Sequence, residues 1–309
     1  MSSLPDKYCL LTNDVETTSV YFNSLRPETG YKVWKEGMPA LLDLYAKYNV
    51  RSTFFFCIDI VKLFPDIVKM VIPYGHEVAS HGYSHEVNDA FDTMPYDKQL
   101  QDLILSKKIL EDISGHEVIS FRAPALRINK STPAALAEAG YKIDSSVPSQ
   151  RFDFFLSFGS VNKLKWIIAP RKPYRTHQYD LTKRGNGTIV EIPLSAIIFP
   201  YVGTTMRLMP RITRIQRYLL NLETGLTHKP MVFDIHPNEF IDESSSPRTI
   251  ERRTKNVITY LFADLIRSHL KVKNLGPPTV PLYTEMLDFY SRKEYCFETI
   301  KDFTSKMKV

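Results

Sequence analysis

The chain has 309 residues, 43% of them hydrophobic, which is enough for the core of one large α/β domain or of two smaller ones. Its formal charge is +6, but no basic cluster combines with the aromatic or glycine signatures of a nucleic-acid module, so no nucleic-acid partner is expected. The three cysteines lie far apart and form no CxxC pair, which argues against a disulfide framework and a cysteine-ligated metal.

Short β-rich runs alternate with amphipathic helices along the chain, a pattern typical of parallel βα units. We expect strands at 8–13, 50–58, 76–81, 117–124, 141–146, 187–195 and 229–240, and helices at 38–49, 63–75, 95–113, 131–140 and 207–223. An irregular insertion near 147–187 is expected to cover a barrel mouth, and a C-terminal helical extension to follow about residue 244. Seven or so βα units predict a single barrel-like domain over residues 1–309.

Polar motifs follow the ends of several predicted strands, where the loops of a parallel sheet converge. Asp14 and Glu16 lie two residues apart, so in an extended chain both point to one face, and two like charges there favour a cation. His81 and His85 would share a face if they lay on a helical turn. Two histidines and a carboxylate form a ligand set with open positions for water, suited to Zn²⁺ or another borderline divalent ion.

The order of these motifs strongly resembles the polysaccharide deacetylases with a NodB-like homology domain. Asp-Val-Glu follows the first strand, His-x-x-x-His the third and Arg-Ala-Pro the fourth, and Ile-His-Pro comes late in the chain. The segments "GYKIDSSV" and "EIPLS" are also similar to parts of that family. The resemblance runs from about residue 8 to residue 240 and preserves motif order and approximate spacing.

The resemblance implies an α/β fold, a distorted or incomplete (β/α)7–8 barrel, and metal-dependent hydrolysis of an acetyl group on a sugar. It implies one divalent metal ion held by Glu16, His81 and His85. Zn²⁺ is the first expectation, with Co²⁺, Ni²⁺, Mn²⁺ and Fe²⁺ as alternatives. An N-acetylated glycan or sugar is the implied substrate.

The resemblance also implies three catalytic residues: Asp14 as general base, Arg122 as the residue that orients it, and His236 as general acid. Their chemistry suits amide hydrolysis, because an amine leaves only when protonated and histidine has a suitable intrinsic pKa. The sequence departs from the family pattern at Glu16, where an aspartate is common, and at Ala125, where a tyrosine often follows the proline. The backbone N–H at that position can still serve as an oxyanion donor.

The residues leave three functions open. One is a sugar N-deacetylase, and the second is a hydrolase of the same fold acting on a non-sugar amide or cyclic C–N bond. The third is a non-catalytic glycan-binding module, which would be expected to have lost Asp14 or His236.

The location is predicted from weaker signals. The N-terminus shows no signal-peptide pattern and no run of about 18 apolar residues occurs, so we expect a cytoplasmic protein. The positive charge and the aromatic and basic stretch 152–175 suggest peripheral contact with the inner membrane surface and a lipid-linked glycan as substrate. The alternative is that this stretch packs over the barrel and the substrate is a soluble sugar.

Overall fold

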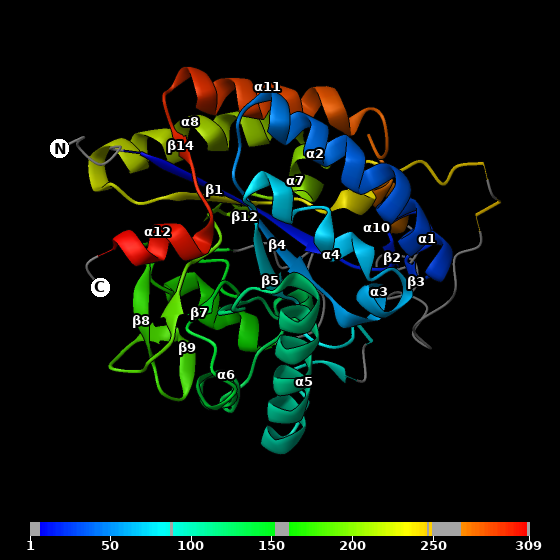
Figure 1. Ribbon diagram of the computed structural model, residues 1–309. Coiled ribbons are helices and arrows are strands. Elements are labelled where there is room, and N and C mark those ends of the chain that lie inside the picture. Colours follow the sequence, from blue (N-terminus) through cyan, green and yellow to red (C-terminus); the bar gives the residue numbers. More distant parts are fainter. Residues whose placement is uncertain (1–6, 87–88, 152–160, 246, 249–266, 308–309) are drawn as a thin grey trace.

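A computed structural model describes residues 7–86, 89–151, 161–245, 247–248 and 267–307. Its main sheet has ten strands in the order β13-β1-β4-β5-β6-β7-β10-β8-β9, with β14 also beside β1 (Figure 1). The strands are β1 (Tyr8–Val15), β4 (Thr53–Phe56), β5 (Glu77–Ser80), β6 (Ser120–Phe121), β7 (Ile143–Asp144), β8 (Tyr174–His177), β9 (Asp180–Arg184), β10 (Val190–Glu191), β13 (Met231–Asp234) and β14 (Cys296–Phe297).

The sheet is parallel from β13 through β10 and curls into an incomplete barrel. Past β10, the N–H of Ser195 donates to the carbonyl of Val232 at 3.2 Å, so the two ends of the parallel part approach each other. The expected distorted or incomplete (β/α) barrel is therefore confirmed. Among the strands that the structure describes in this sheet, the pairs β10–β8 and β8–β9 are antiparallel.

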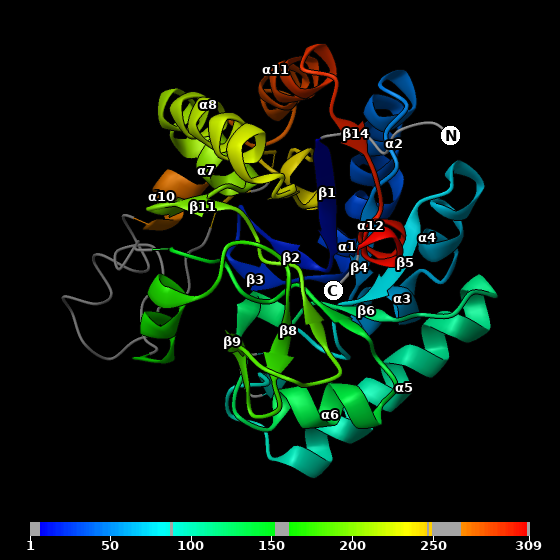
Figure 2. The ribbon, with the colours of Figure 1, turned by 90° about the vertical axis from the view of Figure 1, so that its left-hand side faces the viewer.

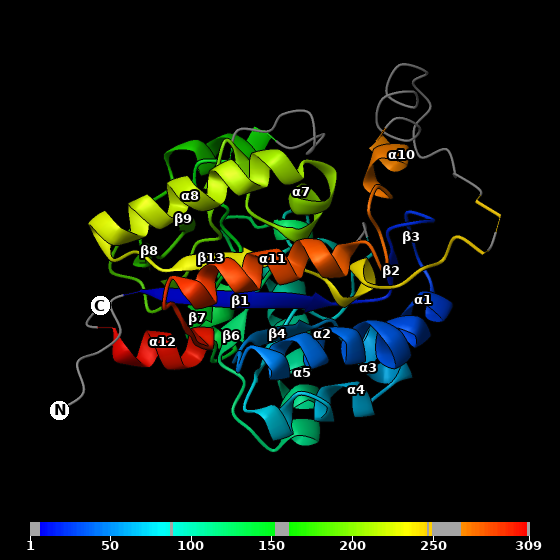
Figure 3. The same ribbon diagram turned by 90° about the horizontal axis from the view of Figure 1, so that it is seen from above.

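Helices surround this sheet on its outer face, except for α12, which packs against the interior cluster (Figure 2). They are α1 (Pro27–Lys32), α2 (Met38–Lys47), α3 (Ile58–Leu63), α4 (Asp66–Lys69), α5 (Tyr96–Ser114), α6 (Thr132–Glu138), α7 (Gly203–Leu208), α8 (Pro210–Thr227), α10 (Arg267–Lys271), α11 (Thr279–Arg292) and α12 (Ile300–Lys306). In the view from above, α8 and α11 lie side by side over β1 and β13 (Figure 3).

Alternation along the central strands builds two hydrophobic clusters, because successive side chains of a strand point to opposite faces. Phe54 and Phe56 join the large cluster beneath the helices, whereas Phe55 points into the barrel. The interior cluster also receives Ile300 and Phe303 from α12. The barrel interior is therefore a packed core, and the polar side chains of the predicted site lie at its mouth.

Several expected elements are shorter or divided in the structure. The expected helix over 63–75 becomes α4 and a separate 3₁₀ turn (Ile72–Tyr74), since prolines interrupt it. The expected helix over 207–223 is divided into α7 and α8 at Met209, which precedes Pro210. The strand expected over 117–124 is only two residues long.

The middle of the chain is more regular than expected. Within the expected insertion 147–187, β8 and β9 form a hairpin that extends the main sheet beyond β10. The hairpin forms because its paired backbone N–H and C=O groups satisfy their hydrogen bonds without water. The stretch expected to contact a membrane lies partly outside the described residues, at 152–160.

The C-terminal part contains α10, α11 and α12, but also β14, which pairs in parallel with the start of β1. The end of the chain therefore completes the sheet. That residues 1–309 form a single domain stays a prediction. Among the helices that the structure describes, none is long and apolar enough to cross a bilayer.

Candidate active site

The alternation of β1 explains why the two carboxylates of the first motif meet. Leu10 points into the interior core, and Thr12 and Asp14 follow on the same face of the strand. Glu16 comes directly after the strand end. Asp14 and Glu16 are both only 5% exposed, so their charges need partners inside the protein.

Glu16, His81 and His85 form one group whose ligand atoms all lie within 4.8 Å of one another. The Nε2 atom of His85 lies 2.7 Å from Oε2 of Glu16, and Nε2 of His81 lies 3.9 Å from the same oxygen. Two imidazole nitrogens and a carboxylate oxygen are a donor set that fits a borderline divalent ion. The predicted ligands are thus brought together, while their role as ligands stays a prediction.

The two histidines do not lie on a helical turn, which corrects the sequence prediction. They follow β5 in an irregular loop that turns at Gly82, whose φ is 77°. The Nδ1 atom of His81 lies 2.9 Å from the carbonyl oxygen of Arg122 and fixes the ring with Nε2 towards the group. Such a contact on the second nitrogen is typical of a metal-binding histidine.

The charges of this group are set by close contacts. Burial disfavours the charged form of Glu16, but His85 outweighs it and lowers the pKa of Glu16 well below its usual value. Burial likewise opposes protonation of His85, but Glu16 raises its pKa overall. Burial lowers the pKa of His81, which favours the neutral imidazole that binds metals.

A second group consists of Asp14, Asp234 and His236, at the ends of the neighbouring strands β1 and β13. The fully buried Arg122 joins it, with Nη1 donating to Oδ1 of Asp14 at 2.9 Å and to Oδ1 of Asp234 at 2.6 Å. Burial opposes ionisation of Asp14, but Arg122 and then the two nearby histidines lower its pKa. The predicted pairing of Arg122 with Asp14 is present.

Other contacts hold Arg122 rigidly. Its Nε donates to the carbonyl of Ser145 at 2.9 Å and its Nη2 to the hydroxyl of Ser145 at 3.0 Å. The guanidinium also lies over the ring of Phe55, 4.4 Å from its centroid. Because these donors and this ring face are fixed, Arg122 holds Asp14 in one orientation.

His236 lies across from Asp14, with Nε2 3.8 Å from Oδ2. Its Nδ1 lies 3.4 Å from Oε1 of Glu239, whose carboxylate is in turn paired with the buried Arg207. Burial opposes protonation of His236, but Asp234 and Glu239 raise its pKa to about 10. Asp234 and Glu239 therefore favour the protonated form of His236.

Two glycines allow helices to approach the segment after His236. A Cβ atom at Gly37 would collide with the carbonyl oxygen of Pro237. A Cβ atom at Gly203 would collide with the carboxylate of Glu239. Close packing at both positions therefore fixes the loop that carries His236.

Asp234, Glu239 and Arg207 were missed by the sequence analysis. Asp234 lies two residues before His236 and hence on the same face of its strand, so the spacing could have revealed it. Glu239 follows in the same motif. Arg207 comes from α7, and no local pattern links it to the site.

The Arg-Ala-Pro motif ends in an unusual turn beside the site. Ala125 adopts a left-handed conformation, with φ 51° and ψ 20°, and Leu126 also has a positive φ of 57°. Such conformations are strained for residues other than glycine and often occur at functional sites. The turn leads directly into a neighbouring pocket.

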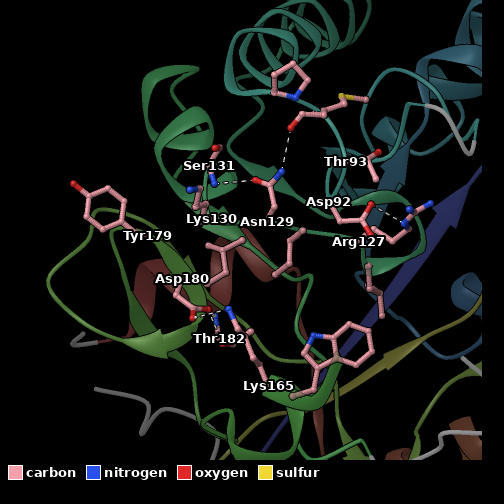
Figure 4. Close-up of a pocket in the computed structure, with 16 residues that line it drawn as sticks. Asp92, Thr93, Arg127, Asn129, Lys130, Ser131, Lys165, Tyr179, Asp180 and Thr182 are labelled. Atoms are coloured by element: carbon pink, nitrogen blue, oxygen red, sulfur yellow. Dashed lines mark hydrogen bonds and ion pairs between the residues drawn. The ribbon is translucent and has the colours of Figure 1, made fainter. Parts of the chain in front are cut away.

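This pocket has a volume of about 590 Å³ and is shown in Figure 4. One wall consists of residues 92–95 and 126–131, which continue the loops that carry His85 and Arg122. The other wall is formed by Lys165, Trp166 and residues 179–182 of the hairpin. Figure 4 shows Tyr179 at one rim and the ion pair of Asp92 with Arg127 towards the other.

Comparison with known proteins agrees with this fold and with the position of the motifs. A family model described as polysaccharide deacetylase matches residues 15–143, which carry Glu16, both histidines and Arg122. Residues 15–143 thus belong to the polysaccharide deacetylase family.

Two relatives named for their substrates match parts of the chain. A peptidoglycan deacetylase of Helicobacter pylori is 33% identical over 117 residues, which are 38% of this chain and 39% of that protein. A peptidoglycan-N-acetylglucosamine deacetylase of Bacillus cereus is 32% identical over 104 residues, 34% of this chain and 47% of that protein. The matches thus span less than half the length of these two relatives.

Solved structures of this deacetylase fold match nearly the whole chain. A structure from Mycobacterium smegmatis assigned to the polysaccharide deacetylases has a TM-score of 0.63 at 18% identity and covers 99% of this chain and 92% of its own. The Puue allantoinase has a TM-score of 0.62 at 13% identity, covering 99% and 91%. At these identities the likeness establishes the fold alone.

Proposed function

We propose that this chain is a metal-dependent hydrolase that removes the acetyl group from an N-acetylated sugar of a glycan. The observation that carries the proposal is the meeting of two groups at one edge of the sheet. Glu16, His81 and His85 offer a donor set for one ion, and Asp14 and His236 lie beside it, 3.8 Å apart. The relatives named peptidoglycan deacetylases support a glycan as substrate.

A divalent ion held by Glu16, His81 and His85 would polarise the acetyl carbonyl and acidify the attacking water. Asp14, kept ionised by Arg122, would accept the proton of that water. His236, whose protonated form is favoured by Asp234 and Glu239, would donate a proton to the leaving amine. These two roles match the surroundings of each residue. Arg122 stabilises the anionic form of Asp14, and Asp234 and Glu239 stabilise the cationic form of His236.

The neighbouring pocket supports a substrate larger than a single sugar. Of its three cationic side chains, Arg127 and Lys165 are paired with Asp92 and Asp180, at 2.7 and 3.4 Å, and the third is Lys130. The two paired charges suit the hydroxyl groups of a neutral saccharide better than they suit a phosphate. Tyr179, which is 60% exposed at the rim, offers a ring on which a sugar could stack.

The test combines metal analysis with a screen for released acetate. Purified protein is loaded with Zn²⁺, Co²⁺, Ni²⁺, Mn²⁺ or Fe²⁺ and given N-acetylated mono- and oligosaccharides, with a cyclic ureide as a non-sugar amide. Metal-dependent acetate release from the saccharides supports the proposal. Hydrolysis of the ureide alone, or no turnover with any loaded ion, would contradict it. The cytoplasmic location and the peripheral membrane contact stay predictions.

A further inference from the structure

The outer face of α8 carries an apolar stripe that no described part of the chain covers. Fifteen large hydrophobic side chains are exposed among the residues that the structure describes, and six of them lie in this one 18-residue helix. Their exposed fractions range from 38% to 83%. The six residues are Ile212, Ile215, Tyr218, Leu219, Leu222 and Leu226.

The aliphatic members of the stripe repeat at intervals of three and four residues, as in a coiled coil. They are Ile212, Ile215, Leu219, Leu222 and Leu226. The face of α8 that packs on the protein is a different one, formed by Thr213, Gln216, Arg217, Leu220 and Thr224. The helix thus has a core-facing side and a second apolar seam that faces away from the core.

The apolar surface continues beyond the helix. Gln216 donates from Nε2 to the carbonyls of Ile197 and Phe199, at 3.0 and 2.8 Å, which holds the turn between them against α8. Ile198 in that turn is 57% exposed. Six exposed hydrophobic side chains on one helix form a contiguous apolar patch comparable with the largest on a typical monomer, roughly 300–600 Å².

The charged residues of α8 other than the exposed Arg211 are paired within the chain. On the α11 side, Arg214 forms a bidentate pair with Glu285, whose carboxylate also contacts Arg217. On the other side, Glu223 pairs with Arg171 and Lys229. A membrane-surface helix usually presents unpaired Lys and Arg beside its apolar face. The paired borders of α8 favour a protein partner.

We propose that this stripe is the interface of a homodimer, in which the α8 helices of two copies pack antiparallel about a twofold axis near Leu219. The aliphatic residues lie nearly symmetrically about Leu219, so Ile212 of one copy would meet Leu226 of the second. An antiparallel arrangement also keeps Arg211 and Arg214, both near the start of α8, away from the same residues of the other copy.

The available area is sufficient for such a dimer. Two copies of the stripe, with Ile198 beside it, would together bury an area on the order of the ~1,000 Å² expected of a biological interface. Leu and Ile in a 3-4 repeat interdigitate well when helices cross at about 20°. The proposal does not depend on the enzymatic activity.

The test is the mass of the full chain in solution. By light scattering after size exclusion, the mass should approach twice 35.7 kDa as concentration rises. The double variant Leu219→Glu and Leu222→Glu places carboxylates at the twofold axis and should weaken dimerisation at least 100-fold. Its matched control is Ile104→Glu with Leu105→Glu on α5, which are 49% and 39% exposed and should not change the mass.

Cross-linking tests the orientation. In a Cys296→Ser background, Ile212→Cys and Leu226→Cys proteins should form a disulfide with each other when mixed, whereas Ile212→Cys alone should not. A monomer at ~100 µM, or a dimer unaffected by the α8 double variant, overturns the proposal. A monomer that sediments with phosphatidylglycerol vesicles through α8 also overturns it, in favour of a membrane-facing helix.

Discussion

Arg122 donates from Nη1 to Oδ1 of Asp234 at 2.6 Å, closer than its 2.9 Å bond to Asp14. One buried guanidinium therefore serves two carboxylates, one of which was not expected from the sequence. Burial, and then the charge of Asp14, raise the pKa of Asp234. Arg122 and Asp234 thus set the charge and position of the proposed base together.

Replacement of Asp234 should separate this positioning role from metal binding. In Asp234→Asn, Asp14 loses a neighbouring carboxylate and becomes a weaker base, so kcat/KM should fall about tenfold with metal content unchanged. The free energy of unfolding should fall by about 3 kcal/mol, because Arg122 loses one buried partner. Asp102→Asn, a buried aspartate on α5, is the control and should keep its rate. Unchanged kcat/KM in Asp234→Asn would refute the role.

The proposed ligand set predicts the effect of removing a histidine. His81→Ala and His85→Ala should each lose most bound metal and activity, because two donors seldom retain a divalent ion against buffer, while circular dichroism stays unchanged. Metal content is measured by elemental analysis after dialysis. His116→Ala, an exposed histidine away from the site, should behave as the unaltered protein. Full metal content in both variants would disprove the assignment.

The two carboxylates of the first motif should differ in function. Asp14→Asn should retain the metal but lower the rate by on the order of 10²- to 10⁴-fold, because it removes the general base. Glu16→Gln should lower metal affinity, because Glu16 lies in the donor group with both histidines. Metal titration and rate measurements on both variants check this. If Asp14→Asn emptied the site and Glu16→Gln did not, the roles would be reversed.

The pocket predicts a preference for longer substrates. Tyr179→Ala removes the exposed ring at the pocket rim, so kcat/KM for an N-acetylglucosamine oligomer should fall about fivefold to tenfold. The value for the monosaccharide should not change. Tyr31→Ala, which removes a ring of similar exposure on α1, is the control. Equal losses for both substrates would exclude a separate subsite.

Stability at acidic pH should depend on Glu223. Burial opposes its ionisation, but Arg171 and Lys229 lower the pKa of Glu223 to about 2. Because the folded pKa lies below the unfolded value of 4.5, this stabilisation is full above pH 4.5 and is lost as pH falls towards 2. Over that pH range, the free energy of unfolding measured with urea should fall by up to about 3 kcal/mol more in the unaltered protein than in Glu223→Gln. Parallel curves for the two proteins would contradict the pairing.

The sequence determined the elements and the identity of the local motifs. A continuous apolar run such as Phe54, Phe55 and Phe56 specifies a strand buried on both faces, because successive side chains of a strand point to opposite sides. The same rule aims Asp14 to one side of its strand. The order of the motifs then indicated the family, while the roles of the six predicted site residues stay predictions.

Only the tertiary structure decided which charged side chains, far apart in the sequence, pair with one another. Arg122 bonds Asp234 and Glu239 pairs with Arg207 because the sheet curls and α7 returns over it, and long-range closure leaves no periodic trace in the sequence. The hairpin of β8 and β9 likewise exists because it can pair with β10. The sequence did not predict that the apolar seam of α8 is exposed, for a related reason. A periodic apolar pattern shows that a helix has an apolar face, whereas burial by neighbours decides whether that face lies in the core.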